Sequence, residues 1–437
     1  MSSKLSARRR FLRDSAALAG LAAGVIPAAA AQMSHMDAPA KAPAKEAPAD
    51  VATKDAVSKD AACEPTDADL VAYGERSHYV KSIRVPVSER MSPDEFGMTF
   101  HVLSPIQDSV GIITPSSLHY VATHRGFYVP DINPDEHRLM IHGMVDRPLM
   151  FTVAELKRFP SVTRVHFLEC SGNRARANHK TVQQSHGMTS CSEWTGVPLS
   201  LLLKEAGVQN GAEFFIAEGD ESVKGAVSLP VAKGMDDCLV CYGQNGEAVR
   251  PQHGFPLRLI VPGFEGMVNV KYLRRIKLVE KNYMTYNDYG HLSPDSKVAA
   301  LNRQIGPKSV ITFPSGDQKL PGPGFYEISG LAWSGSGAIR TVEVSLDGGQ
   351  SWKPAELKTP AYPMAHTRFG LPWKWDGTEA VLMSRCTDEV GTRQPTRAEI
   401  AKYWNVPNDA NLQIKGLDNS VFPWRVASDG TIHNGLA

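Results

Sequence analysis

Runs of apolar residues with the spacing of strands and helices predict a mixed α/β region over residues 69–302. Residues 162–169 have the apolar content of a buried strand, which delivers Cys170 to its carboxyl end. Residues 199–206 repeat apolar positions at helical spacing, and residues 256–261 form a second continuous apolar strand. Together these segments are typical of a packed α/β core.

After this region the pattern changes to short strands with alternating apolar positions. Residues 326–333 and 340–346 read as two such strands, and a turn follows at residues 347–349. This spacing suggests a β-sandwich of immunoglobulin type over residues 303–437. We therefore expect an α+β protein in which a mixed α/β domain precedes an immunoglobulin-like β-sandwich.

The N-terminal segment has a different character. Residues 1–31 place consecutive arginines before an apolar, alanine-rich run, which is typical of a cleavable twin-arginine export signal. The alternative is a membrane anchor, but the run is shorter than the roughly 20 apolar residues of a spanning helix. Residues 32–68 are rich in Ala, Pro, Lys and Asp and predict a disordered tether. We expect a periplasmic protein without a membrane span.

Charge and cysteine content exclude several classes. Lys and Arg number 47 against 46 Asp and Glu, so the net charge of +1 gives no basic field for nucleic acid. Six cysteines are too few for a disulfide scaffold in 437 residues. Cys238 and Cys241 form a CxxC motif, but Tyr242 follows where covalent haem attachment needs histidine. We expect no haem on this chain, and the disulfide status of Cys63, Cys191, Cys238, Cys241 and Cys386 stays open.

Cys170 is the leading candidate for chemistry, because the turn residues after it place it where a strand becomes a loop. Arg174 brings a guanidinium near the thiol, which favours the thiolate that binds soft metals or attacks electrophiles. From the residues alone, a buried structural cysteine is an equally good interpretation. A cysteine nucleophile assisted by His166 or His179 is a third.

Three loops combine basic side chains with turn residues. Residues 253–258 and 261–271 place His, Arg and Lys near glycines, which let a ligand approach the backbone closely. The third loop carries His119, His124 and Arg125. Such side chains can bind a phosphate, although solvated surface turns have the same composition. Together with the thiol, the loops suit a phosphorylated, sulfur-bearing cofactor and an anionic substrate.

Four motifs follow one another along the chain. They are Glu-Cys-Ser-Gly-Asn-Arg at 169–174, Glu-Trp-Thr-Gly-Val-Pro-Leu at 193–199, His-Gly-Phe-Pro-Leu-Arg at 253–258 with Val-Pro-Gly at 261–263, and Val-Ser-Leu-Asp-Gly-Gly at 344–349. In this order they resemble the sulfite oxidase family. The resemblance implies a molybdopterin domain followed by an immunoglobulin-like dimerisation domain, and hence a molybdenum-dependent oxidoreductase that forms a homodimer.

The resemblance also implies roles for single residues. Cys170 matches the cysteine that ligates molybdenum in the family. The residues that match positions holding the pterin or its phosphate are His124, Arg125, Asp220, His253, Arg258, Asn269 and Lys271. Arg125, Arg174 and Lys224 match positions near the substrate, so that with Cys170 they form the implied catalytic set.

Two departures from the family pattern affect the expected substrate. Ala175 follows Arg174 where the family usually has a second arginine, and Lys224 is the nearest match to its catalytic tyrosine. With the export signal and the tether, the chain is most similar to molybdenum subunits of periplasmic sulfane dehydrogenases. That similarity implies a c-type dihaem cytochrome as partner and a persulfide on a sulfur-carrier protein as substrate.

Other functions remain open from the sequence. A sulfite dehydrogenase acting on free sulfite is the alternative within the family. A binding scaffold that kept the fold but lost its cofactor is the alternative outside it, since fold does not imply function. A metal-free hydrolase built on Cys170 and His166 is a third class.

Overall fold

The computed structural model describes residues 79–87, 90–91, 98–123, 129–220, 225–285, 303–358, 360–408 and 418–436. The predicted export signal and tether, and His124, Arg125, Lys224 and Cys63, lie outside the described residues. All described residues belong to one unit, residues 76–437. No helix in these ranges is long and apolar enough to cross a membrane.

The N-terminal region, residues 79–285 where described, begins with a small antiparallel sheet in the order β1-β3-β2, with β4 paired to β3. Its elements are β1 (Val85–Pro86), β2 (Arg90–Met91), β3 (Met98–Leu103), the 3₁₀ turn η1 (Ile106–Asp108) and β4 (Val121–Thr123). This sheet carries the chain to His119 and Tyr120, just before β4.

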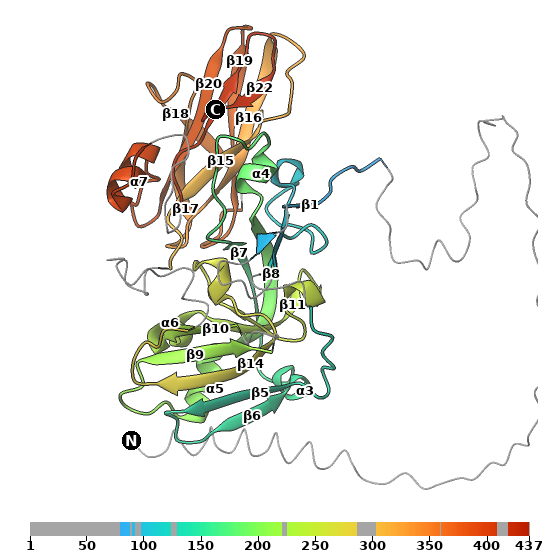
Figure 1. Cartoon of the computed structure of the whole chain (residues 1–437), viewed down its shortest axis with the longest axis vertical. Coiled ribbons are helices and arrows are strands. Elements are labelled where there is room, and N and C mark those ends of the chain that lie inside the picture. The colour runs from blue at the N-terminus through green and yellow to red at the C-terminus, as the bar shows by residue number, and fades with distance from the viewer. Residues whose placement is uncertain are drawn as a thin grey trace, which may run out of the picture. The chain divides into compact units, whose positions relative to one another are not determined.

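A second sheet has the order β10-β9-β14-β5-β6, with β14 and β5 parallel and the other pairs antiparallel (Figure 1). Its elements are β5 (Arg138–Gly143), β6 (Leu149–Thr152), α3 (Val153–Leu156), α5 (Leu199–Ala206), β9 (Phe214–Gly219), β10 (Ala226–Pro230), α6 (Val231–Asp236) and β14 (Leu273–Val279). The predicted helix over 199–206 is confirmed. It ends at Gly207, whose φ of 73° is favourable for glycine.

The third sheet, in the order β12-β11-β8-β7 with β13 paired to β11, carries most candidate residues. Its elements are β7 (Val162–Glu169), α4 (Val182–His186), β8 (Thr189–Pro198), β11 (Leu239–Gln244), β12 (Glu247–Ala248), η2 (Pro251–His253), β13 (Arg258–Ile260) and η3 (Gly266–Val268). The predicted strand over 162–169 is confirmed. The strand predicted over 256–261 is shorter, because Pro256 has no N–H and the Val261 N–H donates to Asn269 Oδ1 at 2.7 Å.

The C-terminal region is a β-sandwich in the order β15-β16-β19-β18-β17-β20-β21-β22. Its elements are β15 (Lys308–Phe313), β16 (Gly324–Trp333), β17 (Ile339–Ser345), β18 (Lys353–Lys358), β19 (Thr367–Trp375), β20 (Ala380–Asp388), α7 (Arg397–Trp404), β21 (Pro423–Val426) and β22 (Ile432–Asn434). β18 pairs with β17 at its start and with β19 at its end, so it joins the two sheets. The hydroxyl groups of Ser309 on β15 and Ser384 on β20 are hydrogen-bonded across the sandwich, at 2.9 Å. The predicted α+β class is confirmed.

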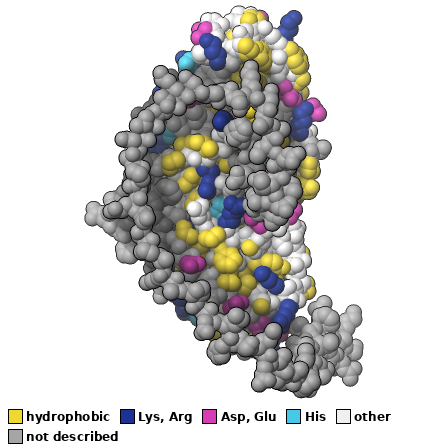
Figure 2. Space-filling view, turned by 90° about the vertical axis from the view of Figure 1, so that its right-hand side faces the viewer, with side chains coloured by type: hydrophobic (Ala, Val, Ile, Leu, Met, Phe, Trp, Pro, Cys, Tyr) yellow, Lys and Arg dark blue, Asp and Glu magenta, His cyan; other side chains and the backbone are white. Residues whose placement is uncertain are grey.

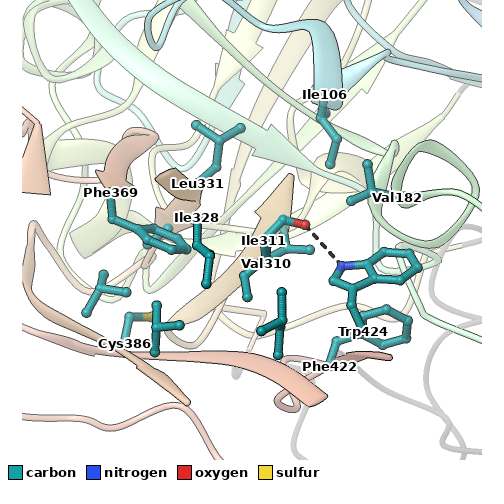
Figure 3. Close-up of a cluster of buried hydrophobic side chains, with 14 of the residues drawn as sticks. Ile106, Val182, Val310, Ile311, Ile328, Leu331, Phe369, Cys386, Phe422 and Trp424 are labelled. Atoms are coloured by element: carbon teal, nitrogen blue, oxygen red, sulfur yellow. Dashed lines mark hydrogen bonds between the residues drawn. The ribbon is translucent and has the colours of Figure 1, made fainter. Parts of the chain in front are cut away.

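Both regions share one apolar core (Figure 3). Ile106 and Val182 of the N-terminal region pack with Ile311 and Leu331 of the sandwich. Trp424 is fully buried in this cluster, and its Nε1–H donates to the Ile311 carbonyl at 3.1 Å. Because this core is continuous, the sandwich supports the segments around β7 and α4 directly.

Candidate active site

Cys170 lies where β7 ends, on a tight turn that buries its side chain. The side chain is only 5% exposed, and Sγ accepts a hydrogen bond from the Gly172 N–H at 3.4 Å. The Cys170 N–H donates to the Met188 carbonyl at 3.0 Å, and the Asn173 N–H donates to the Cys170 carbonyl at 2.9 Å. A rigid strand on one side and these bonds on the other fix the position of the thiol.

Burial, rather than the nearby Arg174, decides the protonation state of Cys170 in the metal-free chain. Burial raises the pKa of the Cys170 thiol to about 11, and this outweighs the Gly172 N–H and the Arg174 charge, which lower it. The group is therefore a neutral thiol near pH 7 until a metal replaces its proton. A buried thiol of this kind is a poor nucleophile.

The cysteine-hydrolase alternative gains no support from the geometry. Within the described ranges no histidine ring is hydrogen-bonded to Cys170 Sγ. Burial lowers the pKa of His166 to about 4 and that of His179 to about 4, since the protonated rings would be poorly solvated. The other described cysteines are buried free thiols, so Cys238 and Cys241 are not joined.

Two buried imidazoles meet beside the third sheet. The rings of His119 and His253 lie 4.7 Å apart between centroids. His253 Nδ1 bonds to Gln244 Oε1 at 2.9 Å, and the Gln244 amide nitrogen donates to Ser192, so the histidine is the donor in this bond. His119 Nδ1 likewise donates to the Tyr120 carbonyl at 2.9 Å. In each neutral ring Nε2 is therefore left as an acceptor.

Three cations surround this histidine pair. Arg258 is buried, and its guanidinium donates to the His253 carbonyl at 2.8 Å. Lys271 Nζ donates to the Ala122 carbonyl at 3.1 Å. Arg84 donates to the His119 carbonyl at 3.3 Å. Burial is the main cause that lowers the pKa of His119 to about 3, and these positive charges lower it further. Burial, then His119 and then the same charges hold the pKa of His253 well below its usual value.

We call these five residues, Arg84, His119, His253, Arg258 and Lys271, the basic cradle. Gly254 permits its compactness, because a Cβ there would lie 2.9 Å from the Lys271 Cα and the φ of Gly254 is +113°. In the space-filling view, Lys or Arg and His side chains lie together in the middle of the displayed face, between hydrophobic groups (Figure 2). Such a concentration of positive charge attracts an anionic ligand.

Comparison with known proteins identifies the kind of site. Two family models match the chain, an oxidoreductase molybdopterin binding domain over residues 126–287 and a Mo-co oxidoreductase dimerisation domain over residues 300–413. The crystal structure of the sulfane dehydrogenase SoxCD from Paracoccus pantotrophus matches with a TM-score of 0.74 and 35% sequence identity, covering 84% of this chain and 97% of that chain. The chain belongs to the sulfite oxidase family of molybdopterin enzymes.

Plant nitrate reductases are also similar to this chain. The NADH nitrate reductase of Solanum lycopersicum is 34% identical over 347 residues, which cover 68% of this chain and 37% of that protein. NADH nitrate reductase 2 of Phaseolus vulgaris is 34% identical over 317 residues, which cover 63% of this chain and 35% of that protein. The chain thus spans little more than a third of these relatives.

The basic cradle fits the molybdopterin cofactor that the first family model implies. His119 Nε2 and His253 Nε2 are buried and lack a hydrogen-bond partner among the described residues. A buried acceptor without a donor costs free energy, and a buried cation needs a counter-charge. A pterin that carries N–H donors and a phosphate satisfies both requirements.

Other residues implied by the family resemblance occupy different surroundings. The Asn269 side chain bonds to backbone groups of Glu265 and Val261, so it supports the loop rather than presenting free donors. Asp220 is exposed and pairs with Arg274 at 3.4 Å, although its N–H donates to the Tyr272 carbonyl beside Lys271. His124, Arg125 and Lys224 lie outside the described residues.

A small cavity adjoins Cys170 between its loop and the C-terminal region. Its lining includes Cys170, Ser171 and Asn173 on the loop and Gly306, Asp418 and Asn419 on the dimerisation domain. Arg174 is half-buried and donates to the Ser171 carbonyl at 3.2 Å, whereas Arg176 is exposed and Ala175 packs against the sandwich core. Of these two arginines, only the charge of Arg174 acts on the thiol.

Sequence reasoning missed two parts of the site. Arg84 reaches the basic cradle from a segment with no motif of its own, so only the tertiary fold reveals it. Glu169 stands in the Cys170 motif, yet its partners Lys308 and Trp333 are 139 and 164 residues away in sequence. No local pattern signals pairings of that range.

Proposed function

We propose that this protein is the molybdenum-bearing subunit of a periplasmic sulfane dehydrogenase. It oxidises a sulfane sulfur held as a persulfide on a carrier protein and passes the electrons to a c-type dihaem cytochrome. The observation that carries this proposal is the likeness to the sulfane dehydrogenase SoxCD, which extends over both domains of the chain. The periplasmic location rests on the twin-arginine pattern in residues 1–31.

When bound, the molybdenum cofactor supplies two-electron oxidation coupled to oxygen transfer from water. Each oxygen atom added to the sulfur in this way releases two electrons and two protons. Cys170 would hold the metal through its sulfur after losing its proton. Arg258, Lys271 and Arg84 would neutralise the phosphate, and the free Nε2 atoms of the histidine pair would accept hydrogen bonds from the pterin.

The charges near Cys170 support a sulfane rather than free sulfite as substrate. Sulfite is an anion, and binding it favours several cations around the metal. Here Ala175 stands beside Arg174 where the family usually has a second arginine. A persulfide delivered by a carrier protein depends less on such charges, because protein contacts supply its affinity.

Turnover assays on the purified, cofactor-loaded protein test this proposal. The substrates are a carrier-like peptide ending in a cysteine persulfide, free sulfite and nitrate, with cytochrome c as electron acceptor for the first two and a reduced dye as donor for nitrate. We expect the persulfide peptide to be oxidised at least about tenfold more efficiently than sulfite, which corresponds to about 1.4 kcal/mol of discrimination. Faster turnover of sulfite or of nitrate would overturn the assignment.

A further inference from the structure

A buried carboxylate lies next to the proposed metal ligand. Glu169 is 3% exposed and immediately precedes Cys170. Its Oε1 accepts hydrogen bonds from Lys308 Nζ at 2.7 Å and from Asn173 Nδ2 at 2.9 Å, and its Oε2 accepts one from Trp333 Nε1 at 2.7 Å. Three donors therefore fix this carboxylate, two of them from the dimerisation domain.

The same network also holds Asn173, at the other end of the Cys170 loop (residues 170–173). Lys308 Nζ also donates to the Asn173 carbonyl at 2.8 Å, and Asn173 Oδ1 accepts the Met188 N–H at 3.1 Å. The residues on either side of the loop segment, Glu169 and Asn173, are thus bound to one ammonium group. A shift of Lys308 would move both together.

Packing of the two domains against each other does not by itself require the buried pair of Lys308 and Glu169. Well-packed apolar side chains stabilise an interface as well as a buried ion pair does, because burial of charge costs much of what the attraction returns. The shared core of Figure 3 already supplies such packing. A buried, hydrogen-bonded pair also fixes the relative orientation of the segments that it joins, since its bonds are satisfied in only one geometry.

We propose that Lys308 and Trp333 of the dimerisation domain are positioning residues for the Cys170 loop. Through Glu169 and Asn173 they hold the loop in the geometry that receives the metal. This inference rests on the proposed role of Cys170 as metal ligand. It assigns the dimerisation domain a part in the metal site besides any part in dimerisation.

The chain offers a matched pair of variants for a test. Trp333→Phe removes the indole N–H that bonds to Glu169, while Trp424→Phe removes the indole N–H that bonds to the Ile311 carbonyl. Both tryptophans are fully buried in the same sandwich core, so the loss of packing is similar. Only the first bond reaches the Cys170 loop. Each variant is made in the full chain and purified without cofactor.

The readout is the rate at which iodoacetamide labels each cysteine, measured by peptide mass spectrometry below the unfolding temperature. Cys241 and Cys386 are buried reference thiols that report global opening. We expect Trp333→Phe to raise the ratio of the Cys170 labelling rate to that of the reference thiols at least about tenfold. A change of this size matches the loss of one hydrogen bond to a charged group. Trp424→Phe should leave the ratio unchanged. Equal ratios in the two variants would overturn the proposal.

Metal content gives a second measurement. In cofactor-loaded preparations, Trp333→Phe should hold less molybdenum per chain than Trp424→Phe, and equal occupancy would count against positioning. If Trp333→Phe does not fold, Lys308→Arg takes its place, because it keeps the charge and changes the geometry. Because the labelling needs neither metal nor substrate, it can fail while the proposed function stands. Full molybdenum occupancy in Cys170→Ser would instead refute the ligand assignment on which both rest.

Discussion

Replacing Lys308 by Met removes the only ammonium bonded to Glu169 among the described residues. Glu169 would keep the hydrogen bonds from Asn173 and Trp333 but lose its counter-charge in a position that is 3% exposed. Removal of one partner from a buried ion pair costs about 3–5 kcal/mol, because the other charge stays buried and unpaired. We expect Lys308→Met to destabilise the protein by that amount.

The measured temperature shift follows from the size of the protein. At about 2.1 cal/mol/K per residue, the folded unit has an unfolding entropy of about 0.7–0.8 kcal/mol/K, so the loss corresponds to about 4–7 °C. The assay is thermal unfolding of four cofactor-free proteins: wild type, Lys308→Met, Glu169→Gln and the double variant. The unfolding temperature of the double variant should fall by only about half as much as that of Lys308→Met, since no charge is then left unpaired.

The reasoning is refuted if the two single shifts simply add in the double variant. Additivity would mean that Lys308 and Glu169 do not interact, whatever their 2.7 Å separation. Ser309→Ala is the matched control on the same strand. It removes the side-chain bonds to Ser384 and Gln394 inside the sandwich, neither of which involves Glu169, and its effect should add to that of Glu169→Gln.

Three further predictions follow from the same structure. Burial lowers the pKa of His366 to about 3 against about 6.5 in the unfolded chain, so the unfolded state binds more protons and stability falls as pH drops below 6.5. Between pH 7 and pH 5 the protonation of this residue in the unfolded chain should lower the free energy of unfolding by about 2 kcal/mol. Urea unfolding at the two pH values should show a correspondingly smaller loss for His366→Gln. Lys271→Met should lower the pterin retained after dialysis, whereas the exposed Arg147→Met should not. A chain ending near residue 300 should be insoluble, because Ile106 and Val182 lose the sandwich core; a soluble, folded product from sedimentation assays would contradict this.

Local patterns predicted much of the fold. The strand over 162–169 and the helix over 199–206 have the same bounds in the structure, because each combines a strong apolar period with a clear terminator. The sandwich strands β16 and β17 differ from the predicted ranges by one or two residues at their ends. The segment 256–261 was harder, since the side chain of Asn269, eight residues further on, accepts the Val261 N–H that would have extended the ladder.

The site was less predictable from the chain alone. The sequence singled out Cys170, His253, Arg258 and Lys271 by residue type and family resemblance, and the fold places the last three in the basic cradle. The residue pattern indicated the effect of Arg174 on the Cys170 thiol but not the larger effect of burial, which depends on tertiary packing. The Glu169 network escaped notice for a related reason, since two of its three donors come from another domain.

We propose that Cys170 ligates molybdenum in a cofactor held by the basic cradle. The most direct test is metal analysis by plasma mass spectrometry of wild type and Cys170→Ser, each matured with its cofactor supply intact. We expect about one molybdenum per chain in the wild type and a large loss in the folded variant, since a serine hydroxyl is a poor ligand for a soft metal. Equal molybdenum in the two proteins, or none in the wild type, would contradict it.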